Sequence, residues 1–99
     1  MSNQDNPMIN ALNDVDSTTD ILISALLNSE EDEAHEAISV MLMQGMHYFG
    51  DNEVVMQQFF PVWDAIRADI ESARMEEALR QARTWKVQLQ EVIEIVRNG

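Results

Sequence analysis

The chain contains no cysteine, only three glycines and two prolines, and no lysine or arginine before position 67. Without cysteine it has no disulfide framework, no thiolate metal site and no cysteine nucleophile. So few glycines form no glycine-rich phosphate loop. The longest apolar stretch, Ile21–Leu27 interrupted by Ser24, is far shorter than the roughly 20 residues that a membrane-spanning helix needs.

The first residues of the chain do not have the pattern of a secretory signal. Met1–Pro7 contain neither a positively charged segment nor an apolar core, so no secretory signal is expected. We therefore expect a cytoplasmic protein. The 99 residues are enough for one small domain, and the 45% hydrophobic content is typical of a chain that folds.

Acidic residues outnumber basic ones by 18 to 6, which gives a net charge of −12. Residues 1–66 contain 12 acidic and no basic residues, whereas residues 67–99 contain six of each. This charge repels phosphate backbones and anionic lipids, so direct binding to nucleic acid or to a membrane is not expected. The basic residues of the last third also lie three or four positions from acidic ones, which is the spacing of ion pairs on a helix: Asp64/Arg67, Arg67/Glu71, Glu71/Arg74, Glu76/Arg80 and Glu94/Arg97.

The pattern of apolar residues predicts an all-α fold, with a flexible acidic and polar arm over residues 1–15 and a single helical domain over residues 16–99. Asp16–Asp20 is a run of residue types that favour helix N-termini, and it precedes a short helix over Ile21–Leu27 that is expected to be buried almost all round. Ser29–Asp32 resembles a capping box that begins a second helix, which ends at Gly50. The apolar positions of this second helix are Ala34, Ala37, Ile38, Met41, Leu42, Gly45, Met46 and Phe49.

Asp51 or Asn52 is expected to cap a third helix. Its apolar stripe continues through Pro61, which predicts one helix kinked at that proline. The stripe comprises Val55, Phe59, Val62, Ile66, Ile70 and Ala73. A second stripe, rotated around the helix axis, comprises Met75, Ala78, Leu79, Ala82, Trp85, Leu89, Val92, Ile93 and Val96. The third and fourth helices are either separate or continuous, and we favour a compact bundle of about four helices.

Neither histidine belongs to a convincing metal site. Asp32 and His35 are one helical turn apart, a spacing that lets both side chains reach one ion. A di-iron bundle, however, needs a second such motif and two further carboxylates, and His47 is preceded at the corresponding position by Gln44. We expect no metal and no cofactor.

Catalysis is not expected either. The serines lack the strand-turn-helix context of a nucleophile elbow, and a domain this small seldom encloses the pocket that a general acid requires. The protein is therefore predicted not to be an enzyme.

The densest charge in the chain is a run of five carboxylates within seven residues at the start of the second helix. A helix N-terminus accounts for two or three of them, because its dipole favours negative charge. The remainder cost stability unless solvent, salt or a basic partner screens them. We interpret the run as a docking face for a basic protein surface, and a purely solubilising role is the competing interpretation.

The outer face of the same helix carries apolar residues where polar ones are expected. Val40 and Met43 line up there with Glu36 and His47, and Phe60 of the third helix lies well away from its own apolar stripe. The predicted partner-binding residues are Glu30, Glu31, Asp32, Glu33, Glu36, Val40, Met43, His47 and Phe60.

These features predict a non-enzymatic regulator or inhibitor that docks on a basic surface of another protein. In a sharper version the partner is a nucleic-acid-binding machine and the carboxylates mimic phosphates, similar in composition to acidic phage-encoded inhibitors of host defence enzymes. The alternative is a structural or assembly adaptor, or a chaperone, that acts as a helical homodimer. The two hypotheses differ in the expected effect of salt on the interface, which is strong for the first and weak for the second.

Overall fold

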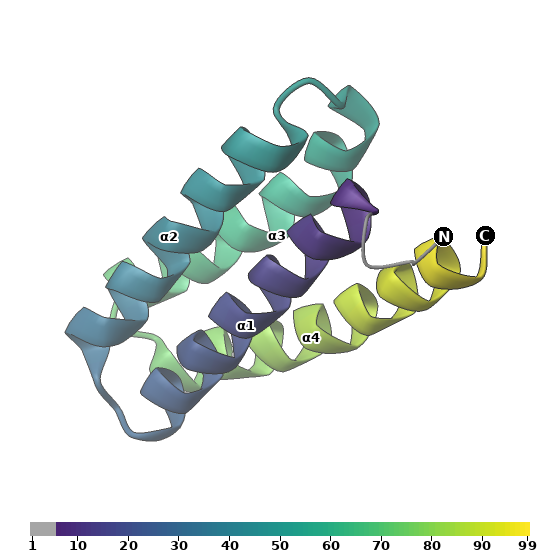
Figure 1. The fold of residues 1–99 in the computed structure, drawn as a ribbon. Helices are drawn as coiled ribbons and strands as arrows, with labels where there is room; N and C mark the ends of the chain where they lie inside the picture. The colour runs from purple at the N-terminus through teal and green to yellow at the C-terminus, as the bar shows by residue number, and fades with distance from the viewer. Residues whose placement is uncertain (1–5) are drawn as a thin grey trace.

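The computed structural model describes residues 6–99, and within them the chain forms four helices and no strand (Figure 1). The helices are α1 (Pro7–Leu27), α2 (Glu31–Phe49), α3 (Glu53–Glu71) and α4 (Met75–Asn98). This confirms the all-α bundle and the separation of the third and fourth helices. α3 runs through Pro61 without interruption, as predicted, while the kink at that proline stays a prediction.

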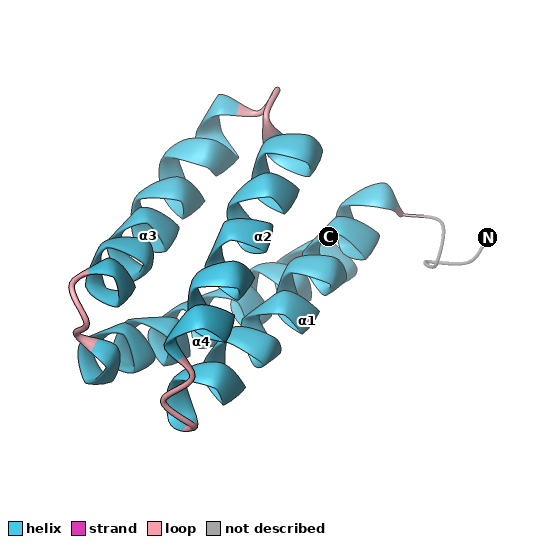
Figure 2. Cartoon of the chain, turned by 90° about the vertical axis from the view of Figure 1, so that its left-hand side faces the viewer, coloured by secondary structure: helices cyan, strands magenta, loops and turns pink. Residues whose placement is uncertain are grey.

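Each helix packs against its neighbours in the sequence, and α4 returns to pack against α1. The contacts join α1 to α2, α2 to α3, α3 to α4 and α4 to α1, which closes a four-helix bundle of 45 × 24 × 18 Å. Figure 2 shows the short connecting loops gathered at the two ends of the bundle. α2 therefore has two neighbours, α1 and α3, and its remaining side faces outward.

The first helix begins earlier than the sequence pattern indicated. The Asn6 side chain accepts hydrogen bonds from the backbone N–H groups of Met8 (2.9 Å) and Ile9 (3.4 Å), and Pro7 occupies the first turn, where its missing N–H costs nothing. Leu12 and Val15 of this segment are buried in the core. The prediction of a flexible arm over residues 1–15 is therefore wrong for residues 7–15, and its first five residues lie outside the described part of the chain.

The run Asp16–Asp20 lies in the middle of α1, so its prediction as a helix start is wrong. Thr18 and Thr19 tolerate this position because their hydroxyls donate to the carbonyls one turn earlier, at 3.1 Å and 2.8 Å. Thr19 is fully buried and also accepts a hydrogen bond from the indole Nε1 of Trp85 at 3.0 Å. The polar residues that resemble an N-cap cluster thus join α1 to α4.

The loops at one end of the bundle use the same device to end a helix. Ser29 after α1 and Ala73 after α3 both adopt positive φ, at 56° and 59°. The backbone N–H of Glu30 then donates to Ala25, and that of Arg74 to Asp69, both at 2.8 Å, which satisfies carbonyls left free at the helix ends. Because Ser29 is used to end α1, it does not cap α2, and the predicted capping box is wrong: Glu30 is the N-cap and its side chain makes no capping bond.

At the other end of the bundle the predicted cap is present. The Asn52 side chain accepts from the Val55 N–H at 3.1 Å, which confirms one of the two caps proposed for α3.

The core is built around two tryptophans. Trp63 and Trp85 are fully buried with ring centroids 5.4 Å apart, and Phe59 packs edge-on against Trp85 at 4.9 Å. Gly45 of α2 makes room for this cluster, because a Cβ there would lie 2.1 Å from Cζ3 of Trp63. The predicted apolar stripes are buried or half-buried with two exceptions. Met46 points to solvent, and Ala73 lies in the α3–α4 turn.

The ion pairs of the last third agree in part with their sequence spacing. Arg67 pairs with Asp64 and, at 3.7 Å, with Glu71, as predicted. Arg74 instead contacts the buried Asp69, with 2.9 Å between Nη2 and Oδ1, and Arg80 pairs with Glu77. The expected pairs Glu71/Arg74, Glu76/Arg80 and Glu94/Arg97 do not form among the described residues. Arg74 pairs with Asp69 because the chain turns there instead of continuing as a helix.

Candidate functional site

The carboxylates at the start of α2 all lie at the protein surface. Each of the five is exposed, and none forms an ion pair with a basic side chain of residues 6–99. They are Glu30, Glu31, Asp32, Glu33 and Glu36. We call this group the α2 acidic cluster.

The carboxylates of the α2 acidic cluster repel one another. A hydrogen bond to the Glu30 carboxyl raises the pKa of Glu33 above its ordinary value, and the charge of Glu30, desolvation and the charge of Glu36 raise it further. A raised carboxyl pKa means that the surroundings disfavour the negative charge. A cation placed near Glu33 would relieve this repulsion.

An apolar groove borders the α2 acidic cluster. It lies between α1 and α2, has a volume of about 330 Å³, and is lined by Thr18, Ile21, Glu33, Glu36, Ala37 and Val40. Ile21 is 60% exposed and Val40 39% exposed. We call it the α1–α2 groove, and its two glutamates belong to the α2 acidic cluster.

Nearer the C-terminal end of α2, side-chain hydrogen bonds join α1 and α2. The Thr18 hydroxyl, which shares its one hydrogen with the Asp14 carbonyl, lies 2.9 Å from Oε1 of Gln44, and the Tyr48 hydroxyl donates to Asp14 at 2.5 Å. This bond to a carboxylate raises the pKa of Tyr48 above its ordinary value. The open groove is thus confined to the part of the α1–α2 hairpin nearest the acidic cluster.

The outer face of α2 has the composition predicted from the sequence. Glu36, Val40, Met43 and His47 are all exposed, Met43 to 71%. The ring of His47 lies edge-on to Tyr48, with 5.1 Å between centroids. The structure therefore brings the predicted α2 residues together on one exposed helix, and their binding of a partner stays a prediction.

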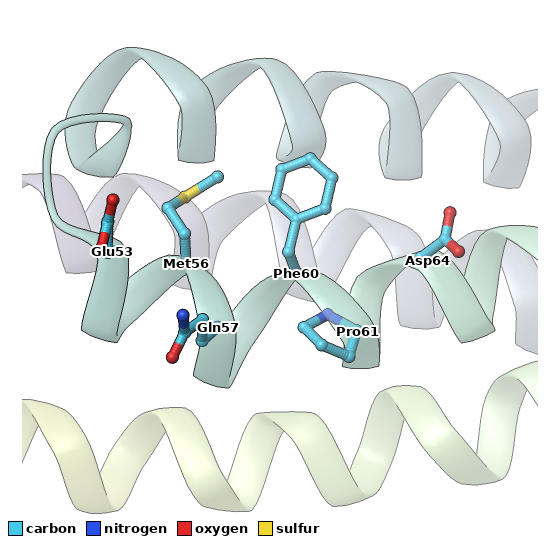
Figure 3. A pocket seen from close by; sticks show the side chains of 6 residues that line it. All are labelled: Glu53, Met56, Gln57, Phe60, Pro61 and Asp64. Carbon is cyan, nitrogen blue, oxygen red and sulfur yellow. The ribbon is translucent and has the colours of Figure 1, made fainter.

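Phe60 does not belong to this surface. It is half-buried on α3, packs against Trp63 with 6.1 Å between centroids, and lines a separate groove along α3 (Figure 3). Ile21 is a surface residue that sequence reasoning missed, because it placed Ile21 in a helix buried almost all round. Ile21 and Leu27 are in fact exposed, because α1 is long and keeps only one face against its neighbours.

Among residues 6–99, no group of three or more histidine and carboxylate side chains is arranged to hold a metal ion. His35 lies 3.7 Å from Glu71 of α3 and forms a contact between α2 and α3. In the same part of the chain, none of the helices is long and apolar enough to cross a membrane.

Comparison of the chain with protein-family models, with curated proteins and with solved structures gives no match. The function must therefore be inferred from the surface itself.

Proposed function

We propose that this protein regulates or inhibits another protein by docking the α1–α2 hairpin on a basic surface of that partner. The proposal rests on one observation: carboxylates that form no ion pair with a basic side chain of residues 6–99 lie at the rim of an apolar groove. The role is binding alone, without catalysis and without a cofactor.

The two parts of this surface have different physical tasks. Carboxylates attract a basic partner over a distance of about 10 Å at moderate ionic strength and speed the encounter. Exposed Ile21, Val40 and Met43 supply the apolar contact that slows dissociation. Methionine is suited to this task because its flexible thioether adapts to the shape of the partner.

A basic protein surface that otherwise holds nucleic acid is the class of partner that we favour. Such a surface carries clustered arginine and lysine side chains that bind phosphate oxygens. Carboxylates repeat along the first turns of α2, and α1 contributes no basic residue beside them. Phosphate mimicry would involve this side of the bundle only, since α4 carries acids and bases in equal number.

The proposal is tested by two variants that remove the same charge from different helices. Glu31→Gln, Glu33→Gln and Glu36→Gln change the net charge from −12 to −9, as do Glu76→Gln, Glu91→Gln and Glu94→Gln on α4. Immobilised proteins are used for affinity capture, and the recovered partners are identified by mass spectrometry. We expect the α4 variant to recover as much of the partner as the wild type does. The α2 variant should recover at least about tenfold less, which corresponds to a loss of about 1.4 kcal/mol of binding free energy.

Equal recovery by the two variants would show that the position of the carboxylates has no effect and would contradict the docking face. An Ile21→Ser variant separates the apolar contact from the charge. It is expected to weaken capture at every salt concentration, because apolar contacts are not screened by ions.

A homodimer is the second candidate, and a patch on α4 favours it. Val87 and Ile95 are 60% and 70% exposed, and they lie two turns apart beside Lys86, Glu91 and Glu94. Light scattering at low and high salt distinguishes the candidates. A dimer that persists at both concentrations would favour a structural or assembly role, and a monomer at both would count against it.

A further inference from the structure

A second groove runs along the outward face of α3 and does not touch the α1–α2 groove. It has a volume of about 740 Å³ and is lined by Glu53, Met56, Gln57, Phe60, Pro61 and Asp64. The spacing of these residues places them on one stripe of the helix. Figure 3 shows Met56 and Phe60 rising from α3 toward α2, with Glu53 at one end of the stripe and Asp64 at the other. We call this the α3 groove.

Pro61 changes the hydrogen bonding of the helix inside this groove. A helical residue normally donates its N–H to the carbonyl four positions earlier, and proline has no N–H. The backbone carbonyl of Gln57 therefore lacks its usual donor, although α3 continues without interruption. Both residues line the groove, and the Gln57 carbonyl oxygen has spare capacity to accept a hydrogen bond.

The carboxylates at the ends of the α3 groove also have capacity to bind a donor. Glu53 forms no ion pair with the described residues, and Asp64 pairs with Arg67 through only one of its two oxygens. The groove thus combines acceptor oxygens with an apolar floor formed by Met56 and Phe60, and no basic residue lines it.

Resting on the proposed function, we propose that the α3 groove binds an arginine side chain of the same basic partner. A guanidinium has five N–H donors, which suits the Gln57 carbonyl together with the Glu53 carboxylate one turn away. Its flat faces stack on an aromatic ring, a contact that Phe60 offers. The arginine stem and a neighbouring apolar side chain fill the remaining volume over Met56.

Other occupants match the groove less well. An anion is repelled by Glu53 and Asp64. A purely apolar side chain would cover the Gln57 carbonyl without giving it a donor, which is unfavourable. Lysine brings one compact charge and no planar face, so it satisfies the carboxylate but stacks less well on Phe60.

The probe is a short amphipathic helical peptide with arginine on its polar face, compared with the same peptide carrying citrulline, which has the same shape and no charge. Nuclear magnetic resonance of the intact protein follows the Met56 methyl group and the Phe60 ring in the α3 groove. The methyl groups of Ile21 and Val40 report separately on the α1–α2 groove. We expect the arginine peptide to shift the Met56 and Phe60 signals in a saturable way, and the citrulline peptide to bind there at least about fivefold more weakly, as loss of a charge-assisted contact of about 1 kcal/mol would give.

Two substitutions test the assigned acceptors. Pro61→Ala restores the N–H that pairs with the Gln57 carbonyl, so it should weaken arginine binding at Met56 by about threefold while it stabilises α3. A residue with a purely structural role would not produce these opposite effects. Glu53→Gln should weaken binding by a similar factor, whereas the matched control Glu91→Gln on α4 should leave it unchanged.

Equal shifts of Met56 and Phe60 with the citrulline peptide would overturn the inference, as would tighter binding to the Pro61→Ala variant. If only Ile21 and Val40 respond, the proposed function stands and the α3 groove is not an arginine site. If only Met56 and Phe60 respond, the arginine site stands and the α1–α2 groove is not the docking face.

Discussion

The start of α2 and the region around α4 use charged residues in opposite ways. Near α4 three cations pair with carboxylates: Arg74 contacts buried Asp69, Arg80 pairs with Glu77, and Lys86 reaches back to α1. The α2 acidic cluster has no such partners among the described residues, and its carboxylates repel one another. These paired charges contribute to folding, whereas those of the α2 acidic cluster oppose it slightly and are available for binding.

Lys86 of α4 forms ion pairs with acidic residues of α1. Its Nζ lies 2.6 Å from Asp16 Oδ1 and 2.8 Å from Asp20 Oδ1, so the one lysine of the chain bridges two carboxylates of α1. Burial lowers the pKa of Lys86, but hydrogen bonds to both carboxylates outweigh it and raise the pKa overall. Asp16 and Asp20 therefore belong to the fold, and the densest group of carboxylates without an ion pair among residues 6–99 lies at the start of α2.

The largest expected effect on stability concerns Asp69, whose carboxylate is buried in the fold. Its carboxylate is buried and accepts from Arg74 Nε at 3.0 Å and from the Gln81 side chain, which joins the α3–α4 turn to both helices. Asp69→Ala removes both bonds and should lower the free energy of unfolding by about 2–3 kcal/mol. Urea denaturation followed by circular dichroism measures the change.

Asp69→Asn is the matched control, because it keeps the shape and part of the hydrogen bonding. It should cost less than Asp69→Ala. If Asp69→Ala costs no more than a substitution in the α2 acidic cluster, the contrast between the two regions does not hold.

The next largest effect tests how the inner face of α2 packs against the core. Gly45→Ala places a Cβ against the rigid, buried ring of Trp63. Overpacking of about 1–3 kcal/mol exceeds the gain of up to about 1 kcal/mol that alanine brings to a helix, so we expect a net loss of roughly 1–2 kcal/mol. Thermal and urea denaturation give the difference.

The control for Gly45→Ala is the same substitution in a background that lacks the contact with the tryptophan ring. In a Trp63→Phe background the smaller ring leaves room for the new methyl group, so adding Gly45→Ala should cost less than in the wild type. An equal cost in both backgrounds would show that the contact with Trp63 is not the reason for this glycine.

Much of α2, α3 and α4 could be predicted because local signals and core packing agree there. Apolar residues recur at helical spacing in all three, and Asn52 caps α3 where it was expected. The start of α1 was missed because two signals compete. Asn6–Pro7 is a true helix start, but Asp16–Asp20 carries five residues of the types that favour N-termini, and the partner that holds Thr19 in mid-helix is Trp85, 66 positions away.

The candidate site was predictable in its charges and less so in its apolar part. Adjacent carboxylates at a helix start stay exposed whatever the packing, so the α2 acidic cluster lies where the sequence placed it. Ile21 lies in a stretch with apolar residues on nearly every side, and only the direction of α1 decides which of them faces solvent. That the Gln57 carbonyl loses its donor follows from Pro61 alone, but the groove that Gln57 and Pro61 line with Glu53 and Asp64 is known only from the fold.

The smallest effect tests the cost of the α2 acidic cluster directly. Since the pKa of Glu33 is raised in the fold, its protonated form is favoured by folding, and the stability this provides at acidic pH is lost as the pH rises through that pKa. Glu33→Gln mimics the protonated form, so it should raise the melting temperature at pH 7 and have almost no effect near pH 4, about the ordinary pKa of glutamate. The gain at pH 7 should shrink in about 1 M salt, where charges are screened beyond about 3 Å. Glu91→Gln on α4 removes the same charge and should change the melting temperature less. A decrease at pH 7 for Glu33→Gln would mean that this carboxylate supports the fold, and the acids of α2 and of the α4 region would then serve the same purpose.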